Sequence, residues 1–550
     1  YSMPGREAGP AWRPHPPFEA HRVKATSMVS MKTMPLPAVA LCLAGVTAAP
    51  AALAEATVEP LDTCFVVPPE GAPPLEMDCG YVVVPESPDR PNGAQVKLGF
   101  LRLPSRAVEA AAPVFMLAGG PGHTLIKSET LLLFSEVFLG LLLDERDVVI
   151  LDQRGGPNAE PLLDCPEMYG LPWEISDRAL DDAGELDLGR QVLADCVASA
   201  RAKGIDLAQY NSVRIAADVD AARQALGYDR IVYYGASYGA QLGQHYMRDF
   251  PGSLEAVILD GANSLSRTSW VEERVRDADV AAQKLAALCE ADAQCGAAYD
   301  VRALLDQAMA LFDDGPIETS YADPSDPDTR IDLTLTARDL ASVIFGFQTG
   351  QIGIHALPAI LAAIVADGRT SAAEVLGEVQ GAAIVASRGA TRSDSAILMH
   401  MAVVCSDDPV TSPADMIVEA DASAYARVYG ASVLEEYIEF CRAVDVPPLP
   451  DATDVDVTTD VPVLVLAGDL DARTPAIRSR LVADTLPRAH FVLFPEGTHV
   501  QLGEINLCAG EILRAFLANP DAAPDTSCIA AMPRRGFVLP DGTVSAGPAE

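Results

Sequence analysis

The sequence predicts an α/β fold with a mostly parallel sheet, and three observations lead to this prediction. Short apolar runs rich in β-branched residues recur along the chain and end in glycine or aspartate. Helical patterns separate them, as in chains whose strands are joined by crossover helices. The later runs are almost continuously apolar, which is typical of strands covered by helices on both faces.

Eight runs are expected to be strands. In chain order they are YVVVP from Tyr81, AQVKLGFLRL from Ala94, PVFMLAGG from Pro113, DVVILDQRG from Asp147, RIVYYGAS from Arg230, EAVILDGA from Glu255, VPVLVLAGD from Val461 and HFVLFPEG from His490. Between the sixth and the seventh run, residues 265–459 carry amphipathic helical patterns instead. So long an interval between neighbouring strands predicts a helical domain of its own, here called the cap insertion.

The chain therefore divides into four expected segments. Residues 1–54 hold upstream residues and an export signal, and residues 55–264 form the first part of the sheet domain. The cap insertion, 265–459, follows, and residues 460–550 complete the sheet domain and end in a tail. The tail after Cys528 contains glycine and proline, and we expect it to be loosely attached.

An export signal is predicted near the start. Met31-Lys32 opens a charged segment, an apolar stretch follows, and Ala52-Leu53-Ala54 satisfies the small-x-small rule of signal peptidase. We expect translation to start at Met31 or Met28 and the mature chain to begin at Glu55, in the periplasm or outside the cell. The alternative is a retained membrane anchor, which the short apolar segment without a cationic flank disfavours.

The cysteines agree with export. Ten remain beyond the signal, and an even number in an exported protein predicts a set of disulfides. Pairing sequence neighbours gives Cys64–Cys79, Cys165–Cys196, Cys289–Cys295, Cys405–Cys441 and Cys508–Cys528.

Charge and missing motifs exclude several function classes. The formal net charge is -38, which disfavours binding to nucleic acids and to anionic membranes. The sequence has no CxxC pair, no GxxxxGK[ST] and no GxGxxG, so we expect neither a metal nor a nucleotide cofactor. A peptide or a small acyl compound is the expected substrate, no membrane span is expected after signal cleavage, and the sequence leaves the oligomeric state open.

A nucleophilic serine is predicted at Ser237. It lies in Gly235-Ala236-Ser237-Tyr238-Gly239, between a strand pattern and a helix pattern that ends before Pro251. A strand-to-helix turn tight enough to expose a serine hydroxyl needs neighbours without side-chain bulk. The backbone N–H of Tyr238 would then face a developing oxyanion.

A serine hydroxyl needs a base, and the base needs an acid that orients it. His499 follows the last predicted strand, where a loop returns to the carboxyl edge of the sheet. Asp469 and Asp471 both follow the strand before it. We expect one to cap the turn and the other to orient His499, and we favour Asp471 for the second role.

A glycine loop follows the third predicted strand. In MLAGGPGHT, Gly119 and Gly120 allow backbone amides to approach a substrate closely, and His123 is positioned to line the site. Acyl transfer needs a second oxyanion donor, and this loop is expected to supply it.

Five motifs together resemble the proline iminopeptidase and tripeptidyl aminopeptidase family of α/β-hydrolases. They are AGGPG at 118–122, DQRG at 152–155, YGASYG at 234–239, GDLDARTP at 468–475 and GTH at 497–499. AVVCSD at 402–407 and the region around Cys508 are similar to the exported tripeptidyl branch. The resemblance implies an α/β-hydrolase fold with a large helical cap, a triad of Ser237, Asp471 and His499, and oxyanion amides from Gly120 and Tyr238.

Two departures from the family bear on specificity. Ala118 stands where the iminopeptidase branch usually has histidine, which points away from strict proline specificity. The cap glutamates that bind a substrate amine in that branch have no recognisable motif here. Candidates for this role are Glu272, Glu273, Asp407 and Asp408.

The expected function is therefore that of an exported serine aminopeptidase that releases short amino-terminal units through an acyl-enzyme. A carboxylesterase or lactonase would use the same triad, because specificity lies in the cap. A binding protein on an inactive hydrolase scaffold is the third hypothesis, and the complete set of catalytic residue types argues against it.

Overall fold

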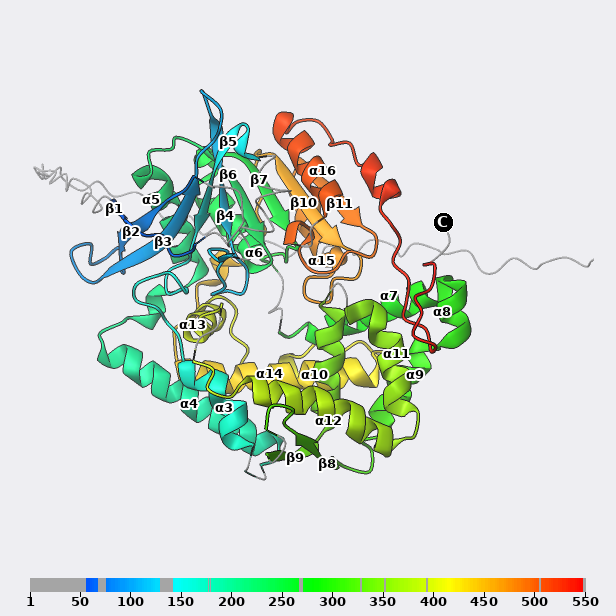
Figure 1. Ribbon diagram of the computed structural model, residues 1–550. Helices are drawn as coiled ribbons and strands as arrows, with labels where there is room; N and C mark the ends of the chain where they lie inside the picture. Colours follow the sequence, from blue (N-terminus) through cyan, green and yellow to red (C-terminus); the bar gives the residue numbers. More distant parts are fainter. Residues whose placement is uncertain are drawn as a thin grey trace, which may run out of the picture. The chain divides into compact units, whose positions relative to one another are not determined.

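A nine-stranded sheet forms the core of the computed structural model (Figure 1). In spatial order its strands are β1 (Thr57–Pro60), β2 (Asp78–Pro85), β3 (Gln95–Leu103), β5 (Arg146–Leu151), β4 (Ala111–Leu117), β6 (Ile231–Ala236), β7 (Leu254–Asp260), β10 (Val463–Gly468) and β11 (Ala489–Phe494). From β5 to β11 all neighbours are parallel, whereas β1, β2 and β3 pair antiparallel at one end. The eight predicted runs are all strands, and β1 is an addition that the sequence did not predict.

The structure describes residues 56–67, 76–128, 142–176, 178, 180–266, 271–326, 329–350, 353–391, 394–503 and 506–547. The predicted start sites and the export signal lie outside these residues and stay a prediction. In the part of the chain that is described, no helix has both the length and the apolarity needed to cross a membrane.

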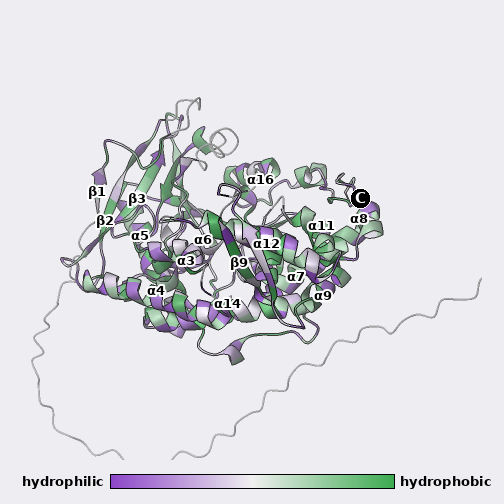
Figure 2. Cartoon of the chain, turned by 60° about the horizontal axis from the view of Figure 1, so that its bottom comes forward, coloured by the Kyte–Doolittle hydropathy of each residue, from purple (hydrophilic) through white to green (hydrophobic). Residues whose placement is uncertain are grey.

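Alternation along the strands creates two apolar layers. On β6, Tyr233 packs with one cluster, which includes residues of α5 (Ser212–Ala225), α6 (Tyr238–Asp249) and α15 (Ala476–Thr485). The adjacent Val232 and Tyr234 belong to the cluster on the opposite face, together with α16 (Leu507–Ala518). Covering both faces explains why these strands are apolar without interruption (Figure 2).

The cap insertion is mainly helical, as predicted. It holds α7 (Arg274–Ala291), α8 (Ala293–Ala298), α9 (Val301–Ala310), α10 (Ala337–Gln348), α11 (Gly353–Val365), α12 (Arg369–Ala386), α13 (Ile397–Asp407) and α14 (Ala424–Val444). A small antiparallel sheet of β8 (Ile317–Ala322) and β9 (Arg330–Leu335) completes it.

The cap insertion does not separate from the sheet domain. From Ala52 onwards the chain forms one compact unit, so the boundaries at 265 and 459 stay predictions. Two helices from the first part of the chain, α3 (Pro166–Ile175) and α4 (Asp182–Ala202), lie beside the cap helices, and α4 packs along α14 (Figure 1). The buried Arg478 of α15 also pairs with Asp277 of α7, with Nη2 to Oδ2 at 2.6 Å.

The prediction of a loosely attached tail is wrong. Phe537 is fully buried in the apolar cluster of the cap insertion, and its ring lies 5.1 Å from that of His355. The N–H of Val538 donates to the carbonyl of His355 at 3.2 Å, and that of Arg535 donates to Glu496 at 2.9 Å. The tail therefore contacts both the cap insertion, through the buried Phe537, and the turn before His499, through Arg535.

Five disulfides are present, in the five pairs that the sequence predicted. They are Cys64–Cys79, Cys165–Cys196, Cys289–Cys295, Cys405–Cys441 and Cys508–Cys528. Each closes a loop between neighbouring elements, and in the chain-entropy account a loop the size of the first contributes about 3 kcal/mol.

Candidate active site

Ser237 occupies a sharp turn between β6 and α6. Its φ is 56° and its ψ is −122°, a backbone conformation that is strained for a residue with a side chain. The turn requires both of its glycines. A Cβ on Gly235 would lie 2.1 Å from the carbonyl oxygen of Gly239, and one on Gly239 would lie 2.6 Å from that of Leu117. The motif is thus explained by steric contacts of the backbone.

The glycine loop after β4 lies directly against this turn. A Cβ on Gly119 would come within 2.8 Å of the Ser237 Cβ and 3.3 Å of its Oγ. Gln153, from the DQRG motif, holds the loop: its amide donates to the carbonyl of Ala118 at 2.8 Å and accepts from the N–H of Gly122 at 3.3 Å. Two of the motifs that carried the family resemblance therefore form one supporting structure.

Two backbone amides are available beside the serine. Tyr238 is the first residue of α6, so its N–H has no partner within the helix. Gly120 lies in the glycine loop with φ at +109°, and among the described residues neither N–H donates a hydrogen bond to another group. These are the positions from which the two oxyanion donors were expected.

His499 and Asp471 are brought together as expected. The Nδ1 of His499 lies 2.8 Å from the Oδ2 of the buried Asp471, whose Oδ1 accepts from the N–H groups of Arg473 and Thr474. Burial alone would raise the pKa of Asp471, but the charge of His499 and these hydrogen bonds lower it to about 2. The carboxyl group is therefore ionised at neutral pH. Asp469 instead pairs with Lys284 of α7 at 2.8 Å.

Thr474 is a further member of this group that the sequence reasoning missed. Its hydroxyl donates to Asp471 Oδ2 at 2.7 Å, and the hydroxyl oxygen lies 3.2 Å from His499 Nδ1, whose N–H it can accept. Gly261, at φ +73°, packs on the same atoms: a Cβ there would lie 2.9 Å from Thr474 Oγ1 and 3.5 Å from Asp471 Oδ2. The only sequence signal for Thr474 was its place in the GDLDARTP motif.

Asp260, at the end of β7, connects the serine turn to the histidine loop. Its carbonyl accepts from the N–H of Ser237 at 2.8 Å, and its carboxyl accepts from the N–H groups of Gln501 and Leu502, each at 2.8 Å. Burial raises the pKa of Asp260 to about 6. One strand end thus positions the candidate nucleophile and the loop of the candidate base.

The side chain of Tyr238 extends to the cap insertion. Its hydroxyl donates to Ser212 Oγ at 2.6 Å, and Ser212 donates in turn to Asp407 at the end of α13 through both its hydroxyl and its N–H. Burial raises the pKa of Asp407 to about 7. Through Ser212, Asp407 therefore supports Tyr238, the residue after the candidate nucleophile. This contact differs from the amine-binding role that was expected for Asp407.

The remaining substrate-binding candidates separate into two groups. Glu273 is buried and paired with Arg478 at 3.0 Å and Arg276 at 3.2 Å, so it holds structure. Glu272 lies close enough to Asp408 for its charge to act there, and burial, then Asp454, then Glu272 raise the pKa of Asp408 to about 8.

His123 lies near the candidate base. Its side chain is exposed, and the charges of Arg473 and of His499 both act on it. Its N–H donates to the carbonyl of Gly119 at 3.3 Å, so the loop fixes its backbone. A neutral imidazole at this place can contact a substrate without adding charge.

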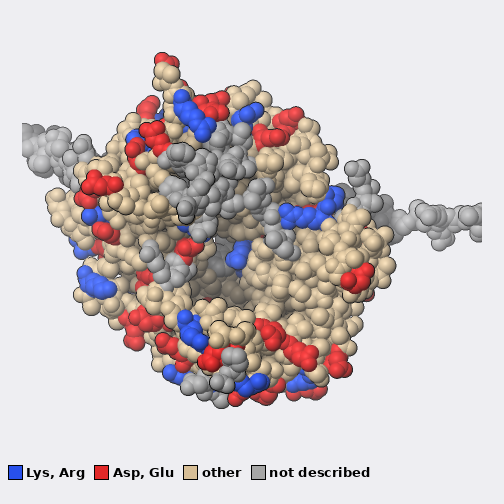
Figure 3. All heavy atoms as spheres, viewed as in Figure 1, with Lys and Arg blue, Asp and Glu red and all other residues tan. Residues whose placement is uncertain are grey.

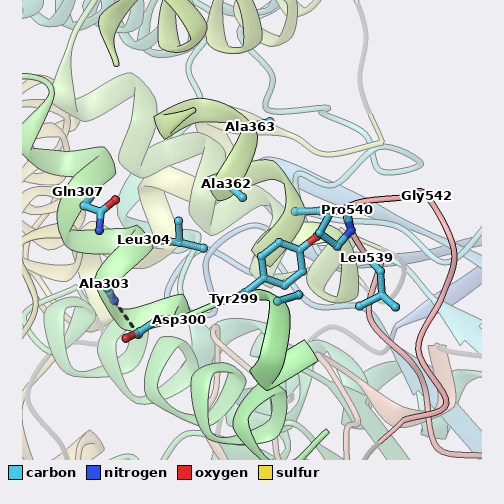
Figure 4. A pocket seen from close by; sticks show the side chains of 12 residues that line it. Tyr299, Asp300, Ala303, Leu304, Gln307, Ala362, Ala363, Leu539, Pro540 and Gly542 are labelled. Carbon is cyan, nitrogen blue, oxygen red and sulfur yellow. Dashed lines mark hydrogen bonds between the residues drawn. The ribbon is translucent and has the colours of Figure 1, made fainter. Parts of the chain in front are cut away.

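Two other features of the described residues are not catalytic candidates. A hollow of about 520 Å³ between α8, α9, α11 and the tail is lined mainly by apolar residues such as Leu304, Ala362 and Leu539 and contains no triad residue (Figure 4). Cys165, Glu167 and Cys196 lie within metal-binding reach of one another, but the two cysteines form a disulfide and offer no thiolate.

Comparison with known families agrees with this geometry. The profile described as "alpha/beta hydrolase fold" matches residues 112–314, and that described as "TAP-like protein" matches residues 426–528. The chain is a TAP-like α/β-hydrolase. The first match covers Ser237 and the glycine loop, and the second covers Asp471 and His499, so the two halves of the site come from two recognisable parts of this hydrolase.

Of three relatives, two extend over most of the chain, and all three are distant in sequence. Serine protease Hip1 of Mycobacterium tuberculosis is 25% identical over 471 residues, covering 81% of this chain and 86% of the relative. Putative hydrolase YuaR of Escherichia coli is 22% identical over 480 residues, covering 82% and 88%. Tripeptidyl aminopeptidase of Streptomyces coelicolor is 26% identical over 215 residues, covering 38% and 39%. The predictions of fold, family and hydrolytic enzyme are confirmed.

Proposed function

We propose that this hydrolase is an exported serine aminopeptidase that releases short amino-terminal units from peptides. The observation that carries the proposal is the 2.8 Å contact between His499 Nδ1 and a buried, ionised Asp471, on the sheet edge where Ser237 stands in its strained turn. An ionised acid fixes the tautomer of the imidazole and leaves Nε2 to act as the base.

The proposed reaction has two steps. His499 takes the proton of Ser237 while Oγ bonds to the scissile carbonyl carbon, and the amides of Gly120 and Tyr238 stabilise the oxyanion. His499 then gives the proton to the leaving amine as the C–N bond breaks. In the second step a water molecule, activated in the same way, releases the acyl group from Ser237.

The choice of peptides over simple esters is supported by the relatives named as a serine protease and a tripeptidyl aminopeptidase. An aminopeptidase must also bind a protonated amine, which needs a carboxylate partner in the protein. We assign this role to Asp408, because Glu273 already pairs with two arginines and Asp407 already accepts from Ser212. Binding of an ammonium group would ionise Asp408.

Export is supported by the small-x-small site at Ala52–Ala54 and by five disulfides, which persist in oxidising compartments. We expect amino-terminal sequencing of exported protein to begin near Glu55. A mature chain that still contains Met31 would contradict this part of the proposal.

The test of the peptidase assignment compares three substrates: a tripeptide anilide with a free amine, its acetylated form and a short-chain ester. We expect the free-amine anilide to have a kcat/KM at least about tenfold above the acetylated one, the ratio that one charge-assisted contact supplies. Equal cleavage of both anilides, or hydrolysis of the ester alone, would instead assign a carboxylesterase.

A further inference from the structure

Arg473 is the feature of the site that the proposed reaction leaves unused. It follows the candidate acid by two residues, and Asp471 Oδ1 accepts from its backbone N–H at 2.8 Å. The start of its side chain is thereby fixed beside the triad. The side chain itself turns toward the cap insertion, where its guanidinium carbon lies 5.7 Å from the ring centre of Phe345 in α10.

The guanidinium lies between the sheet edge and the cap insertion. Its charge acts on His123 of the glycine loop, and it lies near Tyr429 and Tyr437 of α14. In the space-filling view the hollow between these two parts contains blue Lys or Arg atoms, while red Asp and Glu atoms are frequent on the surrounding surface (Figure 3).

Arg473 differs from the arginines around it in having no acidic partner. Arg478 pairs with Asp277 and Glu273, and Arg274 lies 3.9 Å from Asp277. The nearest carboxylate along the chain is that of Asp471. It already accepts from the backbone N–H groups of Arg473 and Thr474, from the Thr474 hydroxyl and from His499. Within the described residues the guanidinium of Arg473 makes no hydrogen bond and no ion pair.

In the part of the chain that is described, Arg473 has no ion pair although the chain has 77 acidic residues against 39 basic ones. Carboxylates that could neutralise it are abundant, yet none is placed within reach among the described residues. The side chain of Arg473 is exposed to solvent, and its guanidinium offers a fork of donors that matches a carboxylate in two hydrogen bonds. The aromatic ring of Phe345 and the loop backbone would hold this fork in place.

We propose that Arg473 binds a carboxylate group of the substrate. This inference rests on the proposed function, because it makes the substrate a peptide. The carboxylate has two possible sources, the carboxyl terminus of a short peptide or an aspartate or glutamate side chain near the scissile bond. In either case the enzyme selects substrates by a negative charge close to the triad.

The test measures binding, so that it does not depend on peptide cleavage. Calorimetry on the full chain with Ser237→Ala compares tetra-alanine with its carboxyl-terminal amide. It also compares tetra-alanine amides carrying one glutamate, at each position in turn, with their glutamine counterparts. We expect at least one acid to bind about tenfold or more tightly than its neutral partner. The first pair reports the carboxyl terminus, and the others report a side chain.

Three variants added to Ser237→Ala assign the preference. Arg473→Gln should abolish it while leaving the affinity for the neutral peptides within about threefold, and Arg473→Lys should retain part of it, because a point charge remains. The matched control is Arg480→Gln, since Arg480 also lies over a phenylalanine, Phe491 at 4.2 Å, but on α15. It should keep the full preference. Circular dichroism checks that each variant is folded.

The inference is overturned if Ser237→Ala alone shows no preference for any acid, or if the preference survives in Arg473→Gln. Equal weakening of acids and neutral peptides by Arg473→Gln would also overturn it and assign a structural role. Cleavage of peptides by the wild type without any acid preference would refute this inference and leave the aminopeptidase intact. An acid preference that depends on Arg473, found without any peptide cleavage, would support this inference and refute the aminopeptidase.

Discussion

The sheet edge and the cap insertion meet at the candidate site, but they are held in place by different means. At the sheet edge, backbone approaches backbone: Gly119 lies against Ser237, and Gly239 lies against the carbonyl of Leu117. Side chains there bond mainly to main-chain groups, as Asp260 does to Gln501 and Leu502. Such contacts leave no room for even one methyl group.

The cap insertion is positioned by side chains instead. Arg478 binds Asp277, Tyr425 donates to Gln348 at 2.6 Å, and Phe345 stacks on Tyr429 at 4.2 Å between ring centres. Side chains can be exchanged without moving the backbone. The backbone of the sheet edge is therefore fixed by contacts that admit no added atom, whereas the cap insertion is held by side chains that could be exchanged.

The largest expected effect comes from the nucleophile itself. Ser237→Ala should lower kcat by about 10⁵-fold or more, since a triad acts as a unit. The melting temperature should stay close to that of the wild type. Activity against both an anilide and an ester is to be measured, because substantial turnover of either would place the nucleophile elsewhere.

The two aspartates after β10 provide a matched pair. Asp471→Asn should lower kcat by about 10³-fold or more, because an amide cannot hold the imidazole in the required tautomer. Asp469→Asn should cost less than about threefold, since it loses only a surface ion pair with Lys284. A greater loss with Asp469→Asn would reverse our assignment of the acid.

Two glycines test whether the backbone contacts matter. In Gly119→Ala the new methyl group would lie 2.8 Å from the Ser237 Cβ, and we expect kcat/KM to fall by about 10²-fold, as a misplacement near 1 Å can cause. Gly252→Ala is the control, because a Cβ there meets no atom within 4 Å. Equal activities of the two variants would show that the glycine loop adapts and is not fixed by its contacts.

The smallest effect concerns the acidic group of the cap insertion. The pKa of Asp408 is about 8 in the folded protein and near 4 when the chain is unfolded, so its ionisation lowers stability as pH rises from 4 to 8. Asp408→Asn should therefore raise the melting temperature at both pH 5 and pH 9, and the increase at pH 9 should exceed that at pH 5 by at least about 2 °C, as roughly 1 kcal/mol does. An equal change at both pH values would exclude this titration.

The features that could be predicted from the sequence lie mainly at the sheet edge and not in the cap insertion. Strands with continuous apolar runs and the GxSxG turn were predictable, because steric rules that act over a few residues determine them. The pairing of His499 with Asp471 and not with Asp469 was favoured but depended on where two loops meet. The contacts of Gln153 with Ala118 and of Thr474 with His499 were not foreseen, because each joins residues that are well separated along the chain.

In the cap insertion and the tail, long-range contacts decided the outcome. Nothing local in the sequence marked Phe537 as buried, since its site is built by helices more than one hundred residues earlier. The hydrogen bonds of Asp407 were likewise not foreseen, because Ser212 reaches it from the sheet domain. The sequence pattern of a helix does not distinguish a carboxylate that is exposed to solvent from one that binds a serine or a substrate.

The order of the disulfides has a consequence for how the chain is made. Beyond the predicted signal, every cysteine pairs with its immediate neighbour along the chain, from Cys64–Cys79 to Cys508–Cys528. A chain that crosses a membrane from its amino terminus exposes these thiols one after another. An oxidant that joins each newly arrived thiol to the one waiting before it produces the native set without reshuffling. Maturation would then need a donor of disulfides but no enzyme that rearranges them.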